Sequence, residues 1–301
     1  MRNKEFNIYE LVTKQILQNM QNGELPWRNT WRKVNGRKPR YTNRFTGNEY
    51  SFFNSLLLGK PGEYIAMTQI KTLGGRLKKG AKSRIIISYG DYVPAKYKDL
   101  EKELLEKGES TEHLKEKYMY YRRVFHLDDV EGIAPTEQPS EKAAVAAEDP
   151  TDITEMVIHD YTVSNGIPVE KTPACQQPHW DCIKDSVEVP EKRQFDFEED
   201  FYATLLSCLV HSTAADGRCD RTAELRKMEQ GQMTVKEELI AEMASSMILA
   251  SAGMHRRETH EQIAAECQRW VREFNNDYSL IIQASYGAEK AAKLIMGRFA
   301  A

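Results

Sequence analysis

The feature that most constrains this chain is a stretch near its middle that lacks large apolar side chains. Residues 134–152 read APTEQPSEKAAVAAEDPTD and are rich in Pro, Ala and Glu. This composition cannot bury enough apolar surface to offset the entropy lost on ordering, so it predicts a flexible linker. A chain of 301 residues leaves enough sequence on each side for a separate core. We therefore predict a domain at 1–133, a linker at 134–152 and a domain at 153–301.

The formal charge is divided unevenly between the two ends of the chain. Residues 1–93 contain 17 Lys and Arg but only 6 Asp and Glu, whereas the whole chain carries a net charge of -3. A basic segment in front of an acidic remainder favours nucleic acid as the partner of the first domain. A merely solubilising role for the basic residues is the alternative that charge alone leaves open.

Periodicity predicts a mixture of helices and strands in the first domain. Apolar residues at helical spacing indicate a helix over 6–22. A Thr-Gly-Asn turn within 43–54 predicts a hairpin or a strand-turn-helix entry, and residues 64–67 and 85–89 are typical of strands. Residues 95–118 alternate Lys and Glu, which predicts an exposed helical insertion, and YYRRVFHL predicts a returning strand.

The second domain is predicted to be mostly helical. After a helix ended by Gly166, short strands are expected at 179–182 and 187–190, followed by helices near 198–213, 234–252, 260–275 and 279–298. The fold class is therefore α+β, with a small α+β domain followed by a mostly helical domain that has a small sheet.

Cysteine usage and hydropathy bear on the environment of the chain. The five cysteines are an odd number without a C-x-x-C pair, which favours reduced thiols over disulfides or a thiolate zinc site. No apolar stretch is long enough for a signal sequence or a membrane span, so we expect a cytoplasmic protein without a membrane role.

The motifs of the first domain resemble those of the DNA-binding domain of ArdC-type antirestriction proteins. LPWRNTW, TNRFTGNEYSFFN, TQIKTLGGRLKKGAKS and VFHLDDVEGI follow one another in that order over residues 8–133. The matching positions are Pro26, Trp27, Thr46, Gly47, Tyr50, Asn54, Leu73, Gly74, Gly75, Lys79 and Gly80. The resemblance implies that this domain binds single-stranded DNA.

The residues themselves support that implication, because single-strand binders combine cations along the phosphates with aromatic rings on which bases stack. The candidate DNA-binding residues are Trp27, Arg28, Trp31, Arg32, Arg37, Lys38, Arg40, Asn43, Arg44, Tyr50, Asn54, Lys78, Lys79 and Lys82. For Trp27, Phe52 and Phe53 an ordinary place in the core is the alternative. Residues 1–133, with a net charge of +9, are expected to bind single-stranded DNA alone.

The second half resembles the zincin-like metallopeptidase domain that follows in the same family. The resemblance is carried by DFYATLLSCLVHST, RCDR and VKEELIAEMASSMIL. The family has an H-E-x-x-H helix in the first of these, where two His bind zinc and the Glu activates water. Here Ser207 and Cys208 stand in place of the first His and the Glu, and only His211 remains. Neither replacement supplies the lost ligand or general base, so no zinc cofactor and no catalysis are expected.

The third zinc ligand of the family is a Glu on the following helix, and Glu238 matches it best, with Glu242 as the alternative. Cys208 stands three residues before His211, so a thiol and an imidazole could pair as in nucleophilic catalysis. A buried small hydrophobe is the simpler interpretation of such a cysteine. The site positions Ser207, Cys208, His211 and Glu238 are thus interpreted as a degenerate metal site.

The resemblance and the residues together imply a non-enzymatic antirestriction or DNA-protecting protein of a mobile element or phage. Its partners would be single-stranded DNA and a host defence protein. Two rivals remain, a peptidase with an unorthodox site of His211, Glu238 and Cys208, and a peptidase-like module for protein interaction.

Overall fold

The computed structural model describes residues 7–21, 23–31, 39–136 and 149–300. The linker predicted at 134–152 falls largely outside the described residues. At its end the prediction is wrong by a few residues, because the helix α6 already begins at Pro150, where Asp149 caps it and a proline suits the first helical turn. Within the described residues, no helix is both long and apolar enough to cross a membrane.

A strongly twisted sheet with an extended arm organises the N-terminal domain. Its strands run in the order β1-β2-β5-β4, where β1 pairs with β2 in parallel and the other neighbours are antiparallel. The bounds are β1 Tyr41–Asn43, β2 Gly62–Ala66, β4 Arg84–Tyr92 and β5 Glu116–His126. A small pair, β3 Arg76–Leu77 and β6 Val130–Glu131, lies beside it. The helices are α1 Ile8–Met20, α2 Pro26–Asn29, α3 Phe52–Leu58, α4 Met67–Thr72 and α5 Lys98–Glu106.

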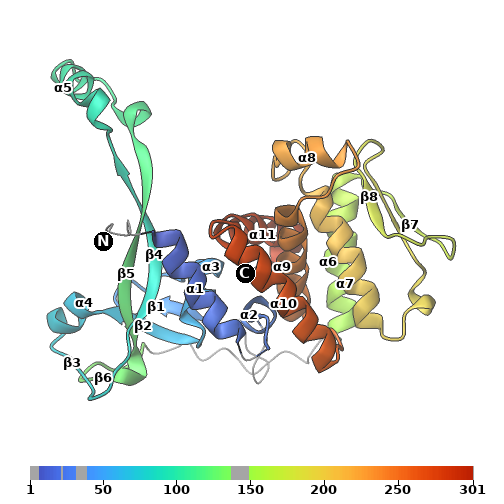
Figure 1. The fold of residues 1–301 in the computed structure, drawn as a ribbon, viewed down its shortest axis with the longest axis horizontal. Coiled ribbons are helices and arrows are strands. Elements are labelled where there is room, and N and C mark those ends of the chain that lie inside the picture. The colour runs from blue at the N-terminus through green and yellow to red at the C-terminus, as the bar shows by residue number, and fades with distance from the viewer. Residues whose placement is uncertain (1–6, 22, 32–38, 137–148, 301) are drawn as a thin grey trace.

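The β4 and β5 strands continue beyond the sheet as a two-stranded ribbon with α5 at its tip (Figure 1). This confirms the predicted charged insertion and the returning strand. The Thr-Gly-Asn motif forms a strand-turn-helix entry, since β1 leads through the turn into α3.

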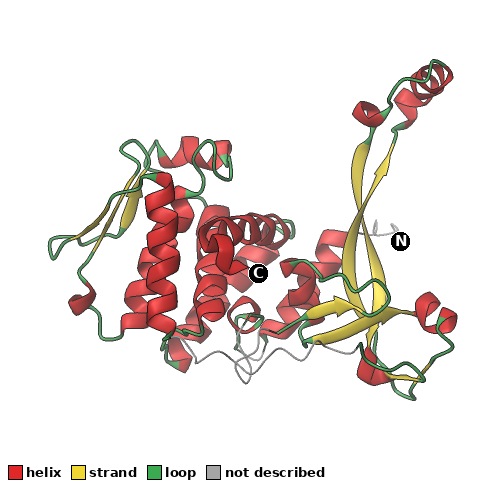
Figure 2. Ribbon diagram, turned by 180° about the vertical axis from the view of Figure 1, so that it is seen from behind, coloured by secondary structure: helices red, strands yellow, loops and turns green. Residues whose placement is uncertain are grey.

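The C-terminal domain is a helical bundle with a small sheet at one end (Figure 2). Its sheet has the order β7-β9-β8, with β7 Val169–Lys171, β8 His179–Asp181 and β9 Ser186–Val189. The helices are α6 Pro150–Asn165, α7 Glu198–Ser212, α8 Thr222–Met228, α9 Val235–Ala252, α10 His260–Asn276 and α11 Leu280–Met296. Buried residues surround most of α9, so this helix lies at the centre of the bundle.

One hydrophobic core joins the two domains. It contains apolar residues of α1, α2 and α3 together with those of α7, α9, α10 and α11. Trp27 on α2 packs against Trp270 and Phe274 on α10, with ring centroids 6.3 and 6.2 Å apart. The first helices of the N-terminal domain therefore complete the core of the C-terminal domain.

Candidate functional site

A row of aromatic and basic side chains runs along one face of the β4–β5 ribbon. Residues directly opposite in an antiparallel pair share a face, and the register pairs Gly90 with Tyr118 and Tyr92 with Glu116. The rings of Tyr92 and Tyr118 are 5.8 Å apart, and those of Tyr118 and Tyr120 are 5.5 Å apart. We call this row, Tyr92, Tyr118, Tyr120 and Arg122, the tyrosine ladder.

Arg122 is the last residue of the ladder, at the end nearest to the four-stranded sheet. Its guanidinium lies 5.2 Å from the centre of the Tyr120 ring, and its Nη2 donates a hydrogen bond of 2.9 Å to the Tyr120 hydroxyl. Tyr118 is 47% exposed, although tyrosine side chains are usually at least partly buried. The ladder therefore offers a cation and accessible π faces side by side, the combination that binds unpaired bases and their phosphates.

Gly90 makes room for the ladder. A Cβ at this position would lie 2.8 Å from the ring of Tyr118, closer than two carbon atoms approach. The ring can therefore lie across the opposite strand only because residue 90 has no side chain.

The turn after β1 lies next to the base of the ladder. Asn43 accepts hydrogen bonds from the backbone N–H groups of Phe45 and Thr46, which fixes the turn, and donates one of 3.2 Å to the Tyr50 hydroxyl. Burial raises the pKa of Tyr50, and the nearby charge of Arg122 acts in the opposite direction. The predicted residues Asn43 and Tyr50 thus adjoin the ladder, and Phe45 is exposed on the same turn.

The sequence analysis identifies none of the four ladder residues, because YYRRVFHL indicates only a returning strand and Tyr118 falls at the end of the insertion predicted at 95–118. The signal was present in its alternation. Tyr118, Tyr120 and Arg122 stand two residues apart, so a strand places them on one face.

The predicted Lys-rich loop after β3 is solvent-exposed. Lys78, Lys79 and Lys82 are all exposed, and Lys78 also donates a hydrogen bond of 2.7 Å from its Nζ to the backbone oxygen of Asp128. Lys82 also lines a cavity of about 220 Å³ together with Arg84 and His126. Lys79 and Lys82 can therefore reach a phosphate backbone, while Lys78 helps to hold the loop.

Two predicted DNA-binding residues are buried instead. Trp27 has 0% exposure, so the prediction that its ring contacts DNA is wrong, and the alternative of a core residue holds. Asn54 is also wrong as a DNA contact, since it exchanges two buried hydrogen bonds with the backbone of Ile87 and ties α3 to β4. Trp31 is half-buried against Phe52, with ring centroids 6.1 Å apart.

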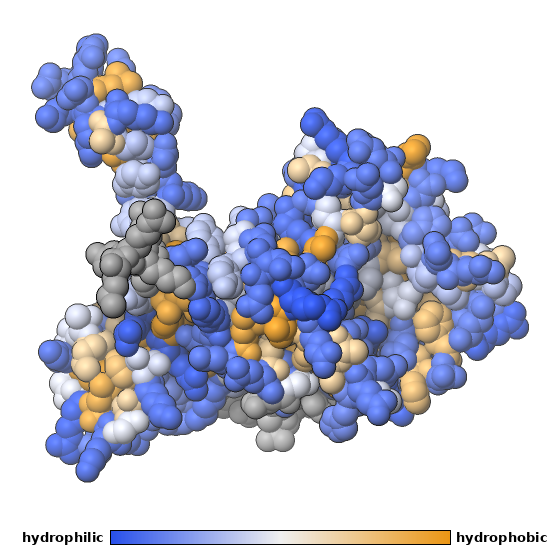
Figure 3. Space-filling view, in the orientation of Figure 1, coloured by the Kyte–Doolittle hydropathy of each residue, from blue (hydrophilic) through white to orange (hydrophobic). Residues whose placement is uncertain are grey.

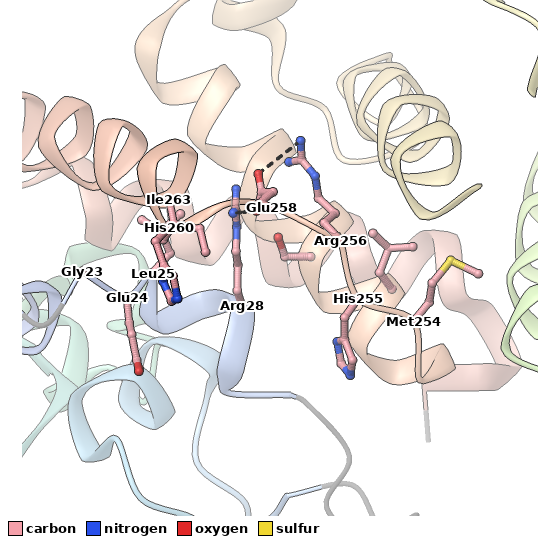
Figure 4. A pocket seen from close by; sticks show the side chains of 12 residues that line it. Gly23, Glu24, Leu25, Arg28, Met254, His255, Arg256, Glu258, His260 and Ile263 are labelled. Atoms are coloured by element: carbon pink, nitrogen blue, oxygen red, sulfur yellow. Dashed lines mark hydrogen bonds and ion pairs between the residues drawn. The ribbon is translucent and has the colours of Figure 1, made fainter. Parts of the chain in front are cut away.

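Arg28 is the third correction, because it faces the other domain. Its guanidinium makes ion pairs with Glu242, Glu258 and Glu266, and the contact to Glu242 measures 2.6 Å. Burial opposes the charge of Arg28, but the three carboxylates outweigh it and raise its pKa. Figure 4 shows Arg28 reaching toward Glu258 beside a cavity of about 330 Å³ between the domains. Arg28 therefore fastens the domains together and is not available to a phosphate.

The remaining predicted cations differ in their surroundings. Arg40 pairs with Glu49 at 2.9 Å on the surface, and Arg44 donates to the backbone oxygen of Ala134 at 2.9 Å. Arg32, Arg37 and Lys38 lie outside the described residues.

In the C-terminal domain, the predicted site positions Ser207, His211 and Glu238 come together. They line one cavity of about 210 Å³ between α7, α9 and α10, together with Glu242 and Arg269. Helical spacing places Ser207 and His211 on the same side of α7, one turn apart. The match of Glu238 with the third ligand position is thus consistent with the geometry.

His211 has the support that a metal-binding histidine usually has. Its Nδ1 lies 3.1 Å from Oε1 of Glu237, and Arg221 holds that buried carboxylate with two hydrogen bonds, of 2.5 and 2.8 Å. A carboxylate on one ring nitrogen orients the other nitrogen toward a ligand. Arg221 is the second arginine of the RCDR motif.

Cys208 points away from this cavity into the core. It is 4% exposed, and burial raises the pKa of its thiol to about 12. A thiol with this pKa stays protonated near neutral pH, so it cannot serve as a nucleophile beside His211. The described cysteines are all free thiols.

The residues in the cavity do not fit a zinc ion. A catalytic zinc needs three protein donors, and Ser207 contributes only a neutral hydroxyl that already bonds to the backbone oxygen of Ala203 at 2.9 Å. The carboxylate of Glu238 is engaged by the guanidinium of Arg269 on α10. Within the described part of the chain, no three His, Cys, Asp or Glu residues are grouped as a metal site.

Comparison with known proteins gives both halves of the chain a family. Residues 6–125 match the N-terminal domain of anti-restriction factor ArdC, and residues 162–287 match a zincin-like metallopeptidase. Two curated relatives from Escherichia coli, both described as DNA primase TraC, are each 25% identical. The similarity covers 96% and 94% of this chain but only 27% and 19% of the primases, so the chain spans about a quarter or less of their length.

Two crystal structures of the antirestriction ArdC protein from plasmid R388 share the fold over almost the whole chain. The metal-free structure is 24% identical and the Mn(II)-bound structure 23% identical, each with a TM-score of 0.65 and 98% of this chain covered. The matched regions cover 98% and 99% of those chains. The chain therefore combines a domain of the ArdC N-terminal family, over residues 6–125, with a domain of the zincin-like metallopeptidase family, over residues 162–287.

Proposed function

We propose that this chain is an antirestriction protein of a mobile element or phage that binds single-stranded DNA on the tyrosine ladder and does not cleave peptides. The ladder is the observation that carries the proposal. It combines exposed rings with Arg122, and the cations Lys79 and Lys82 lie in the same domain. The protein would act in the cytoplasm, where it would coat or cap entering strands and encounter a host defence protein.

Single strands are favoured over duplex by the kind of contact that the ladder offers. An exposed ring can stack on an unpaired base, whereas the bases of a duplex are already stacked on each other. The ribbon is narrow and carries its cation at one end of the row of rings. A partner with accessible π faces and a phosphate backbone fits this surface best.

The zincin-like domain is proposed to act as a scaffold or protein-binding surface. Ser207 supplies no strong donor, and the three carboxylates that line the cavity with His211 are engaged by arginines, Glu238 by Arg269 and both Glu242 and Glu266 by Arg28. An unorthodox peptidase remains the second candidate, because His211 still has the carboxylate support of Glu237. Elemental analysis of the purified chain and a protease assay separate these alternatives. About one zinc per chain, lost together with proteolysis in H211A, would establish the peptidase.

The first prediction tests the ladder in the full chain. Y118A should weaken binding to a single-stranded oligonucleotide by about tenfold or more, because one stacked base contributes about 1–3 kcal/mol. Y118F is the matched control, since it keeps the ring and should bind almost as the wild type does. Fluorescence anisotropy with single-stranded and duplex oligonucleotides measures both variants. Unchanged affinity in Y118A, or equal affinity for duplex, would rule out the proposed contact.

A further inference from the structure

The face of the sheet that carries the tyrosine ladder continues past Arg122 toward the base of the ribbon. On β5, Arg122, Val124 and His126 stand two residues apart, so their side chains lie on one face. The register adds two residues from neighbouring strands, because Arg84 of β4 stands opposite Val124 and Tyr64 of β2 stands opposite His126. Arg84, Tyr64 and His126 thus share a face with the ladder.

This shared face turns away from the zincin-like domain. Ile85 and Ile87 occupy the other face of β4 and pack into the core that joins the two domains. A space-filling view shows the ribbon standing clear of the helical body (Figure 3). A strand that leaves the ladder toward the sheet therefore stays on the N-terminal domain.

A cavity of about 220 Å³ lies on the shared face, near the end of β5. Tyr64, Arg84 and His126 line it from three strands of the sheet. The segments that follow α3, β3 and β5 supply the remaining lining residues, Lys60, Gly80, Lys82, Asp128 and Asp129. The cavity thus connects the face of the ladder with the Lys-rich loop.

Two of the lining side chains are held by the backbone. Nε2 of His126 lies 3.1 Å from the backbone oxygen of Pro61, and its Nδ1 accepts a hydrogen bond of 3.1 Å from the backbone N–H of Asp128. The Tyr64 hydroxyl donates a hydrogen bond of 2.6 Å to the backbone oxygen of Lys60, and the rings of Tyr64 and His126 are 4.9 Å apart. His126 and Tyr64 therefore form a wall of the cavity and leave ligand binding to its charged side chains.

The charged side chains of the cavity are not fully balanced. Lys60 pairs with Asp128 at 2.7 Å, and this contact lowers the pKa of the Asp128 carboxyl. Among the described residues, neither Lys82 nor Arg84 has an ion-pair partner, and both side chains are exposed. Asp129 adds a second carboxylate to the lining, so three cations face two anions. Lys82 and Arg84 are the cations that remain for an anionic ligand.

We propose that this cavity binds the terminal phosphate of a single strand that lies on the tyrosine ladder. The proposal rests on the proposed function, because the ladder holds the same strand. A phosphate monoester carries about −1.5 to −2 charges near neutral pH, whereas a phosphate between two nucleotides carries about one. Lys82 and Arg84 together match the greater charge, and a guanidinium can bind two phosphate oxygens at once. The cavity would thus cap the end of the strand that the ladder coats.

The distance between the ladder and the cavity suits a short piece of one strand. His126 lies four residues after Arg122, which corresponds to roughly 13 Å along a β-strand. A DNA strand advances about 3.4 Å per nucleotide even when its bases are stacked. About four nucleotides or fewer therefore connect Arg122 with the cavity.

The test uses the full chain and oligo(dT) of about 10 nucleotides, within the roughly 4–16 nucleotides that single-strand binding domains occupy. The oligonucleotide carries a phosphate at its 5′ end, at its 3′ end or at neither end. Isothermal titration calorimetry at one salt concentration measures the three affinities. One phosphorylated form should bind about tenfold more tightly than the unphosphorylated form, because charge-assisted hydrogen bonds to a phosphate are strong. The end that gives this gain identifies the direction of the strand.

Two double variants assign the gain to the cavity. K82A/R84A should lose it and bind the two phosphorylated forms no more tightly than the unphosphorylated one. R226A/K227A is the matched control, because it removes one arginine and one lysine that are exposed on α8, far from the ribbon, and should keep the gain (Figure 1). All four side chains are exposed, so thermal melts of both variants should equal that of the wild type.

The outcomes separate the cavity from the ladder. If a phosphate at neither end raises the affinity, or if K82A/R84A keeps the gain, the terminal-phosphate site is overturned. If Y118A binds the unphosphorylated form as tightly as the wild type does, the ladder fails, and the ratio of phosphorylated to unphosphorylated affinity still tests the cavity. If both contacts exist, Y118A weakens binding of all three forms and keeps that ratio.

Discussion

Arg269 places a permanent positive charge in the cavity where a zincin would hold its metal. Its guanidinium pairs with Glu238, so that carboxylate is already neutralised without an ion. Glu242, the alternative ligand, accepts hydrogen bonds from Trp27 and Arg28 of the other domain. Glu266, which also lines this cavity, pairs with Arg28 too, so all three acidic residues of the cavity have guanidinium partners.

The second prediction concerns recovery of metal binding. S207H/R269A should bind zinc more tightly than S207H alone, because both variants supply a second imidazole but only the double variant frees the carboxylate of Glu238. S207A/R269A is the control and should not bind zinc. Isothermal titration calorimetry with zinc distinguishes the three proteins. If S207H/R269A takes up no zinc, the backbone does not keep the family's metal geometry.

Restoring the general base with C208E, in addition to the histidine at position 207, would be a poorer test of the metal site. Cys208 is buried within the core, so a glutamate at this position would lack water and a partner for its charge. An unpaired buried charge is strongly unfavourable. Loss of folding in C208E would therefore say nothing about the metal site.

At the scale of elements, the ribbon is the part of the fold that creates the ladder. Each ring stands on a strand position whose side is fixed by the alternation of β4 and β5. Gly90 lies outside the left-handed region, so its conformation is one that other residues can adopt. Its importance comes only from the space that it leaves to Tyr118.

The third prediction concerns the space that Gly90 leaves for the ring of Tyr118. G90A should push the ring of Tyr118 aside and weaken single-strand binding several-fold, while thermal stability changes little because the displaced group is the exposed end of a side chain. G90A/Y118A should bind no more weakly than Y118A, since both changes act on the same ring. Anisotropy and a thermal melt of each variant provide the two measurements. Full binding by G90A would show that the position of the ring is unimportant.

At the scale of the whole molecule, the two domains depend on each other. The shared core contains apolar residues of α1, α2 and α3, which a fragment ending at residue 133 would expose to water. The expected binding of residues 1–133 alone is therefore a poor test, because failure could arise from misfolding. The full chain is the right material for every binding experiment.

The fourth prediction concerns the Arg28 contact between the domains. R28A should lower the free energy of unfolding by up to about 3–5 kcal/mol, since it removes the nearest cation from three largely buried carboxylates and leaves only the longer contacts of Arg256 to Glu242 and Glu258. W27F is a milder comparison, because it keeps an aromatic ring in the core and loses the 3.3 Å hydrogen bond to Glu242. Urea denaturation at neutral pH measures both variants. An R28A protein as stable as the wild type would contradict the role of this contact.

The stability of R28A should also depend on pH. Burial, and then the charge of Glu242, raise the pKa of Glu266, and Arg28 opposes this shift. A raised pKa in the folded state means that stability is lost as the pH rises through it and is regained on acidification. The stability difference between R28A and the wild type should therefore be larger at neutral pH than near pH 5, which urea denaturation at both pH values would test.

The sequence by itself determined the elements of this protein, the basic character of its first domain and the loss of the zinc-binding motif. Helices and strands follow from a periodicity that is local in the chain, and a missing histidine is visible without a fold. Only the tertiary structure decided which side chains face solvent. Trp27 and Glu242 are 215 residues apart in sequence yet share a hydrogen bond, and no local pattern reveals such a partner. The alternation of Tyr118, Tyr120 and Arg122 is visible in the sequence, but only the register of β4 and β5 shows that Tyr92 lies beside Tyr118.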